Sequence, residues 1–291
     1  METRKQSKTR DGLPAETLSR GGAKDLRSIR EQVAQHLLDY PSNMQRCIRE
    51  QQAIQQNILG DPALLDGPNY RRISSRTLQR MFVEYDERFF LGQTQRLVEF
   101  RQGSLDFRLS KRMTRTGGKT TRIDFAQPTA TGQLRSYEIT LSSHLLFQAF
   151  KTSNPRPELV SGVRCRNRLE ATQRIFEHEM LHLLEMLLWV HSSCAESRFK
   201  RMARRLFGHT QSTHQLPTRG EVAKTEFGLA AGQWVEFTHE GKTLTGFVNR
   251  IGQRATVLVK HAGGELYSDG FHYQKFYVPL KLLARSQRKS G

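Results

Sequence analysis

The segment at residues 168–190 constrains the fold more than any other part of the chain. Its pattern predicts one long helix that is apolar nearly all round near its end, and a helix of that kind is usually buried. The same segment carries His178, Glu179 and His182 in the sequence HEMLH. Burying such groups without partners costs several kcal/mol. The fold must therefore give this helix an apolar surround and also partners for three polar side chains.

The spacing of HEMLH suits a metal ion. His178 and His182 are four residues apart, so they share one helix face and their imidazoles can bind a single tetrahedral Zn²⁺. Glu179 is turned about 100° around the helix, where its carboxylate can act as general base toward a water molecule in peptide hydrolysis. With 10 histidines in 291 residues, chance gives only about 0.02 matches to HExxH. The alternative is a pair of core histidines and a glutamate satisfied by hydrogen bonds.

Hydrophobic periodicity and turn residues predict the other elements of the first 217 residues. The expected helices span 24–59 with an interruption at Pro41, then 76–90, 143–150 and 194–206. The expected strands span 96–101, 105–109, 112–116, 120–125 and 137–141.

The pattern changes after residue 225. Short runs rich in β-branched and aromatic residues alternate with turn residues at a spacing of about 8–12 residues, which favours an SH3-like β-barrel at 225–284 with Trp234, Phe247, Tyr273 and Phe276 mostly in its core. The predicted fold class is α+β. The predicted organisation is a disordered basic tail at 1–23, a helical extension at 24–72, a domain around HEMLH at 73–217, the barrel, and a basic tail at 285–291.

The formal net charge of +18 favours a polyanionic partner, of which nucleic acid is the commonest. Two basic clusters could contact the phosphates of DNA or RNA, or could be solvated faces. One lies on the predicted hairpin (Lys111, Arg112, Arg115, Lys119, Arg122) and one follows HEMLH (Arg198, Lys200, Arg201, Arg204, Arg205).

The chain has no apolar run that approaches the ~18–20 residues of a membrane-spanning helix. Its N-terminal sequence lacks the apolar segment of a secretory signal, and its three cysteines lack CxxC spacing. We therefore expect a cytoplasmic protein with reduced thiols and no membrane partner. The sequence does not indicate an oligomeric state.

HEMLH and several ordered segments resemble the SprT-like zinc metalloprotease family. TLQRMFVEYDERFFLGQ resembles the opening helix of that family, FRLSKRMTRTGGKTTR its β-hairpin, and YEITLSSHLL its edge strand. The RF-K-RM pattern and THQL at 213–216 are similar to the segment after the third ligand, so the resemblance covers about 75–217. It implies a small zincin fold with helices on a short β-sheet, a zinc cofactor and a protein substrate.

The chain departs from the family pattern at the third metal ligand. The family supplies it from a His-Gly-x-x-Phe/Trp motif, but the residue four before Phe199 is Ala195, which cannot bind metal. We predict Glu196 as the third ligand, although an acidic residue is also favoured in a helix's first turn for electrostatic reasons alone. The alternatives left open are Cys194, His191, His209 and His214.

Two further expectations follow from the same comparison. Glu185 lies on the helix face of His178, where it can support the metal ligands through hydrogen bonds. The family's C-terminal zinc ribbon is absent, and the predicted barrel stands in its place. Because the third ligand departs from the family pattern, the competing function is a non-catalytic nucleic-acid-binding protein on a degenerate SprT-like scaffold.

Overall fold

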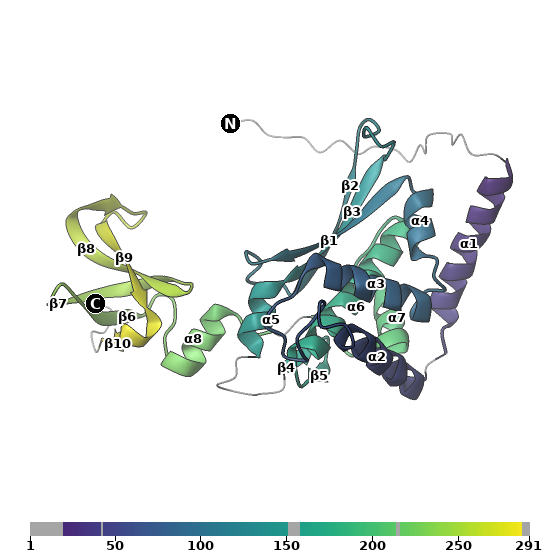
Figure 1. Ribbon diagram of the computed structural model, residues 1–291. Coiled ribbons are helices and arrows are strands. Elements are labelled where there is room, and N and C mark those ends of the chain that lie inside the picture. The colour runs from purple at the N-terminus through teal and green to yellow at the C-terminus, as the bar shows by residue number, and fades with distance from the viewer. Residues whose placement is uncertain (1–19, 42, 151–157, 214–215, 287–291) are drawn as a thin grey trace.

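The computed structural model describes residues 20–41, 43–150, 158–213 and 216–286 (Figure 1). In these residues the chain is a mixed α+β protein with a C-terminal antiparallel sheet, as predicted. The predicted tails at 1–23 and 285–291 lie almost wholly outside the described residues, as does His214. None of the described helices is both long and apolar enough to cross a membrane.

The helix that carries HEMLH is α6 (Arg168–Trp189), and it runs through the centre of the first core (Figure 1). Asn167 begins the helix, since its side chain accepts a hydrogen bond from the Glu170 backbone N–H. Leu181, Leu184 and Leu188 are fully buried, as the all-round apolar pattern predicts.

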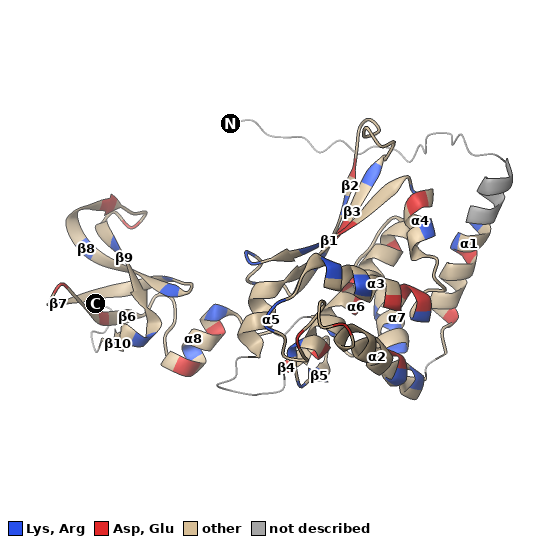
Figure 2. Cartoon of the chain, viewed as in Figure 1, with Lys and Arg blue, Asp and Glu red and all other residues tan. Residues whose placement is uncertain are grey.

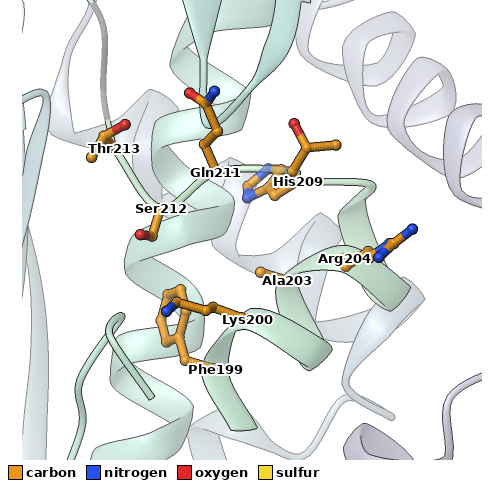
Figure 3. Close-up of a pocket in the computed structure, with 9 residues that line it drawn as sticks. Phe199, Lys200, Ala203, Arg204, His209, Gln211, Ser212 and Thr213 are labelled. Carbon is orange, nitrogen blue, oxygen red and sulfur yellow. The ribbon is translucent and has the colours of Figure 1, made fainter. Parts of the chain in front are cut away.

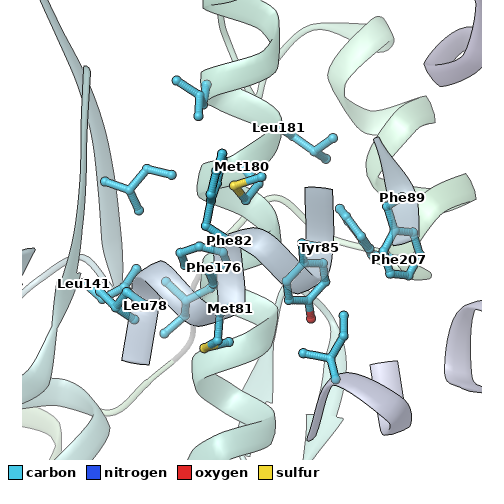
Figure 4. Packing of buried hydrophobic residues seen from close by; sticks show 14 of the residues in the cluster. Leu78, Met81, Phe82, Tyr85, Phe89, Leu141, Phe176, Met180, Leu181 and Phe207 are labelled. Carbon is cyan, nitrogen blue, oxygen red and sulfur yellow. The ribbon is translucent and has the colours of Figure 1, made fainter. Parts of the chain in front are cut away.

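Four other helices enclose α6. They are α2 (Met44–Leu59), α3 (Ser75–Phe89), α5 (Ser143–Ala149) and α7 (Ser197–Phe207). Figure 4 shows Leu78 and Phe82 of α3 packed close to Phe176 of α6. Helix α1 (Arg20–Asp39) lies against α4 (Thr94–Phe100) and α7. These helices confirm the predicted segments at 24–59, 76–90, 143–150 and 194–206 to within a few residues.

A three-stranded sheet lies beside α6. Its strands are β1 (Gly103–Ser110), β2 (Gly118–Asp124) and β3 (Arg135–Ser142) in the order β1-β3-β2. β3 pairs with β1 in parallel and with β2 antiparallel. Two predictions are therefore wrong: β1 and β2 do not form a hairpin, and β3 is central instead of an edge strand. Thr140, Leu141 and Ser142 are consecutive and buried, so both faces of β3 are covered, which is the environment of a central strand.

Two other predicted strands are also absent from the described chain. Residues 96–101 fall mainly in α4, whose first residue, Thr94, donates its backbone N–H to the buried Asp86 carboxylate at 2.9 Å. The apolar pair Leu97 and Val98 is buried there by helical packing, so a short apolar run was misassigned. Residues 112–116 form the loop between β1 and β2.

The C-terminal sheet has five antiparallel strands in the order β10-β6-β7-β8-β9. They are β6 (Trp234–His239), β7 (Lys242–Ile251), β8 (Arg254–Leu266), β9 (His272–Pro279) and β10 (Ala284–Arg285), with the short helix η1 (Leu280–Leu282) before β10. Of the aromatic residues predicted for its core, Tyr273 is buried, while Trp234, Phe247 and Phe276 are partly buried. The SH3-like character of this sheet stays a prediction.

A helix that the sequence analysis missed precedes this sheet. It is α8 (Arg219–Phe227), which begins between the predicted domain at 73–217 and the predicted barrel at 225–284. Thr218 and Glu221 form a capping box, in which each side chain bonds the backbone N–H of the other residue. Ala223 of α8 packs into the core of the C-terminal sheet with Val235 and Val257. That core is separate from the one around α6.

Candidate metal centre

Three side chains converge beside the middle of α6. His178 and His182 face each other with their Nε2 atoms 3.1 Å apart, and Cys194 Sγ completes a group whose ligand atoms all lie within 4.8 Å of one another. Two imidazole nitrogens bound to one tetrahedral zinc ion at about 2.1 Å are about 3.4 Å apart. The histidine pair thus has nearly the geometry that a shared metal requires. The group could hold a metal ion.

Cys194 arrives from the connection between α6 and α7. Glu196, the predicted third ligand, is exposed at the residue that begins α7 and is not part of this group. His191 is also exposed and outside the group. The third member of the group is Cys194, one of the alternatives the sequence left open. The physical reason is the short connection, which brings residue 194 back over α6 before α7 starts.

His209 has a different role. It is buried, and its Nε2 lies 2.9 Å from Glu177 Oε2. The fully buried Glu177 carboxylate also accepts hydrogen bonds from Tyr85 Oη at 2.7 Å and Gln51 Nε2 at 2.9 Å, and it pairs with Arg174 Nη1 at 3.2 Å. This network ties the end of α7 to α6, α3 and α2, so His209 holds α7 in place.

Glu179 is held by β2. Thr120 Oγ1 lies 2.8 Å from Glu179 Oε2 and 3.0 Å from the backbone oxygen of Glu179. A Cβ at Gly118 would lie 2.6 Å from Glu179 Oε1 and 2.8 Å from Ile175 Cγ2. Only glycine lets the strand approach α6 this closely. The edge strand of the sheet therefore fixes the carboxylate that the sequence identifies as the general base.

His182 is oriented by a second layer of polar groups. Its Nδ1 lies 2.7 Å from Ser192 Oγ, and Ser192 Oγ donates to Glu185 Oε2 at 2.9 Å. Glu185 is fully buried and also pairs with Arg198 Nε at 2.8 Å. Because Ser192 gives its proton to a carboxylate, it must accept the proton of His182 Nδ1, which leaves the Nε2 lone pair directed at the metal position. The expected supporting role of Glu185 thus takes the form of a Glu185–Ser192–His182 relay.

A strained turn brings this connection back over the helix. Val190 has φ 68° and ψ −39°, and the backbone N–H of His191 donates to Trp189 O at 2.7 Å, which defines a γ-turn of the rare positive-φ kind. Strain at a functional site persists only where the surroundings enforce it. Here Arg122 holds the turn, since its Nη1 donates to the carbonyl oxygen of Val190 at 3.0 Å.

Three arginines cover the last carbonyl groups of α6. Arg101 donates two hydrogen bonds to Leu187 O, Arg30 donates two to Leu188 O, and Arg122 donates one to Val190 O. These side chains come from the C-terminal end of α4, from α1 and from β2. Cations stabilise the carbonyl end of a helix, where backbone acceptors lack helical partners. The end of α6 that leads into the turn is therefore bonded to α1, to the end of α4 and to β2.

Phe199 of α7 packs against His178 and His182 and also lines a neighbouring cavity, which Figure 3 shows. Its ring centroid lies 4.8 Å from that of His178 and 4.6 Å from that of His182. The same side chain lines a cavity of about 600 Å³ between α7 and the segment 209–213. One aromatic ring thus contacts both histidines and lines the cavity.

Figure 2 marks the positions of Lys and Arg along the chain. The side chains of the two predicted basic clusters are only partly free to meet a partner. Arg122 binds Asp124 and Val190 O, Arg198 binds Glu185, and Arg205 donates to Leu38 O at 2.6 Å. The remaining members are exposed: Lys111, Arg112, Arg115 and Lys119 before or on β2, and Lys200, Arg201 and Arg204 on α7.

Comparison of the chain with protein-family models, with curated proteins and with solved structures finds no match. The SprT-like resemblance therefore stays a prediction. Ser192, Phe199 and Thr120 are site residues that sequence reasoning missed. A serine, a phenylalanine and a threonine carry no distinctive spacing, so only the fold reveals their positions.

Proposed function

We propose that this protein is a zinc-dependent endopeptidase in which His178, His182 and Cys194 hold the metal and Glu179 is the general base. The observation that carries the proposal is the pair of facing histidine Nε2 atoms with Cys194 beside them. Thr120 of β2 holds the carboxylate of Glu179, which lies next to His178 on α6. Two imidazoles and a thiolate form a ligand set that zinc accepts in catalytic sites, with the fourth position left for water or substrate.

The chain's own groups then have defined tasks. A bound zinc ion supplies Lewis-acid polarisation of the scissile carbonyl and lowers the pKa of water. Glu179 takes a proton from the attacking water and delivers it to the leaving amine, and Thr120 holds the carboxylate for both transfers. The Glu185–Ser192–His182 relay keeps His182 in the tautomer that binds metal.

The test is Glu179→Gln in the full chain, assayed on an unfolded protein substrate after zinc loading. We expect about one zinc per chain in both proteins by elemental analysis, and a loss of at least about 100-fold in cleavage for the variant. Glu87→Gln, which changes an exposed carboxylate on α3, is the matched control. Cleavage by Glu179→Gln at the parent rate would refute the proposal. Absence of bound metal after loading would instead favour a pair of core histidines.

A second function, binding of DNA or RNA, is favoured by the exposed cations at Lys111, Arg112 and Arg115 and on α7. Phosphate contacts of this kind weaken steeply with salt, and each one lost reduces the logarithmic salt slope by about 0.7–0.9. We expect a variant with all three loop cations changed to Gln to bind an oligonucleotide with a shallower slope than the parent. Binding that is independent of salt would exclude this function.

A further inference from the structure

The cavity beside Phe199 has walls with a consistent chemistry. Helix α7 supplies one wall and the segment after it supplies the other. The residues that line it are Phe199, Lys200, Ala203, Arg204, His209, Thr210, Gln211, Ser212 and Thr213. No acidic side chain is among these described residues. The lining combines an apolar floor with hydroxyl groups and two cations.

The two cations are available to a ligand. Lys200 and Arg204 are one helical turn apart and exposed, and neither forms an ion pair with an acid in the described part of the chain. Arg205, by contrast, is occupied by Leu38 O. In Figure 3 the Lys200 side chain lies alongside Phe199 with Ser212 above them, while Arg204 extends to the opposite side. Of the two cations, Lys200 is therefore the one that lies beside the Phe199 ring in this view.

The position of Phe199 relates the cavity to the proposed chemistry. The buried Phe199 lines the cavity, and its ring centroid lies 4.8 Å from that of His178 and 4.6 Å from that of His182. A peptide whose scissile bond lies at the metal centre can thus place a neighbouring side chain in the cavity. The volume of about 600 Å³ exceeds that of one side chain and leaves room for adjoining backbone.

We propose that this cavity binds an Asp or Glu side chain of the peptide substrate, with Lys200 as the recognising cation. This inference rests on the proposed peptidase function. A carboxylate satisfies Lys200 and accepts hydrogen bonds from hydroxyl groups such as that of Ser212, and the aliphatic part of the side chain packs on the methylene stem of the exposed Lys200. A nucleic-acid strand is a poorer occupant, because its phosphates require a row of cations along an open groove, whereas this cavity lies between one helix and one short segment.

The experiment measures binding without cleavage. Full-length Glu179→Gln protein is titrated into short fluorescent peptides that differ only in carrying Asp or Asn at one position, and Kd is read by fluorescence anisotropy at fixed ionic strength. We expect the Asp peptide to bind about 10-fold more tightly, as a charge-assisted hydrogen bond allows. Lys200→Met, in the same background, removes this preference. Arg201→Met, which takes an equal charge from the same helix outside the cavity, retains it.

Three results overturn the inference. They are equal affinity for the Asp and Asn peptides at every position tried, no binding of either at millimolar concentration, and a preference that survives Lys200→Met. Displacement of both peptides alike by a short oligonucleotide, in a manner that needs Lys200, would assign the cavity to nucleic acid instead.

The outcomes for the cavity and for the peptidase are separable. If the parent protein cuts no substrate but the Asp preference depends on Lys200, the cavity assignment stands and the peptidase proposal fails. If Glu179-dependent cleavage occurs without any preference for acidic peptides, the peptidase proposal stands and the cavity assignment fails.

Discussion

Replacing Ser192 with Ala should weaken metal binding without unfolding the protein. Ser192 Oγ links His182 Nδ1, at 2.7 Å, to the buried Glu185 carboxylate, at 2.9 Å. Without the hydroxyl, His182 is no longer held in the tautomer whose Nε2 binds metal. Loss of such an outer hydrogen bond typically costs 10–100-fold in metal affinity, which corresponds to about 1.4–2.7 kcal/mol.

The effect on folding should be smaller than the effect on the metal. Glu185 keeps its ion pair with Arg198 and its hydrogen bond from the Ser193 backbone N–H at 3.2 Å, so the buried carboxylate stays paired. One uncharged partner is lost, which costs about 1–2 kcal/mol in the free energy of unfolding. Urea denaturation of the metal-free protein measures this quantity separately from metal affinity.

The assay is competition for Zn²⁺ against a chromophoric chelator. Ser192→Thr keeps the hydroxyl and should recover most of the parent affinity. Ser197→Ala, which removes an exposed hydroxyl from α7, is the matched control. The reasoning fails if Ser192→Ala binds zinc as tightly as the parent. It also fails if Ser192→Thr is no better than Ser192→Ala.

Three further predictions concern the same region. Val190→Gly should raise the free energy of unfolding by about 1 kcal/mol, because relief of positive-φ strain outweighs the extra chain entropy of glycine. Little packing is lost, since the Val190 side chain is 49% exposed. A lower stability in urea denaturation would contradict this prediction. Gly118→Ala should destabilise the fold and lower cleavage, because the added Cβ would lie 2.6 Å from Oε1 of Glu179, the proposed general base. An unchanged melting temperature together with unchanged activity would contradict this prediction, since it would show that β2 can move away from α6. Burial raises the pKa of Cys47 and of Cys165 to about 12, which leaves about one thiolate in ten thousand at pH 8. A thiol reagent at that pH should therefore modify only the partly exposed Cys194 rapidly in the folded protein, zinc should slow that reaction, and rapid modification of two or three thiols would refute the assignment.

The sequence predicted the elements whose pattern is long and regular. The segments that became α2, α3 and α6 were predicted to within a few residues, because each has a sustained apolar periodicity. The segment 96–101 was not, because a short apolar run fits a helix and a strand equally and the deciding contact, from Asp86 to Thr94, is tertiary. Strand order was also beyond the sequence, since nothing local shows that β3 pairs with both β1 and β2.

The candidate metal centre also has a part that the sequence could predict and a part that it could not. His178 and His182 follow from helix geometry alone, so their pairing was predictable. The third ligand depends on how the chain turns after α6. A γ-turn at a valine is a conformation that the sequence disfavours, and it shortens the path so that Cys194, and not Glu196, reaches the histidines.

The two separate hydrophobic cores have a consequence for heating experiments. His178, His182 and Cys194 all belong to the part of the chain built around the first core, while the second core joins α8 to the C-terminal sheet. Calorimetry should then resolve two cooperative transitions, of which zinc raises the temperature of one by mass action and leaves the other in place. The transition of the C-terminal sheet would then be an internal reference in the same sample. The difference between the two transition temperatures would report how fully the metal centre is occupied.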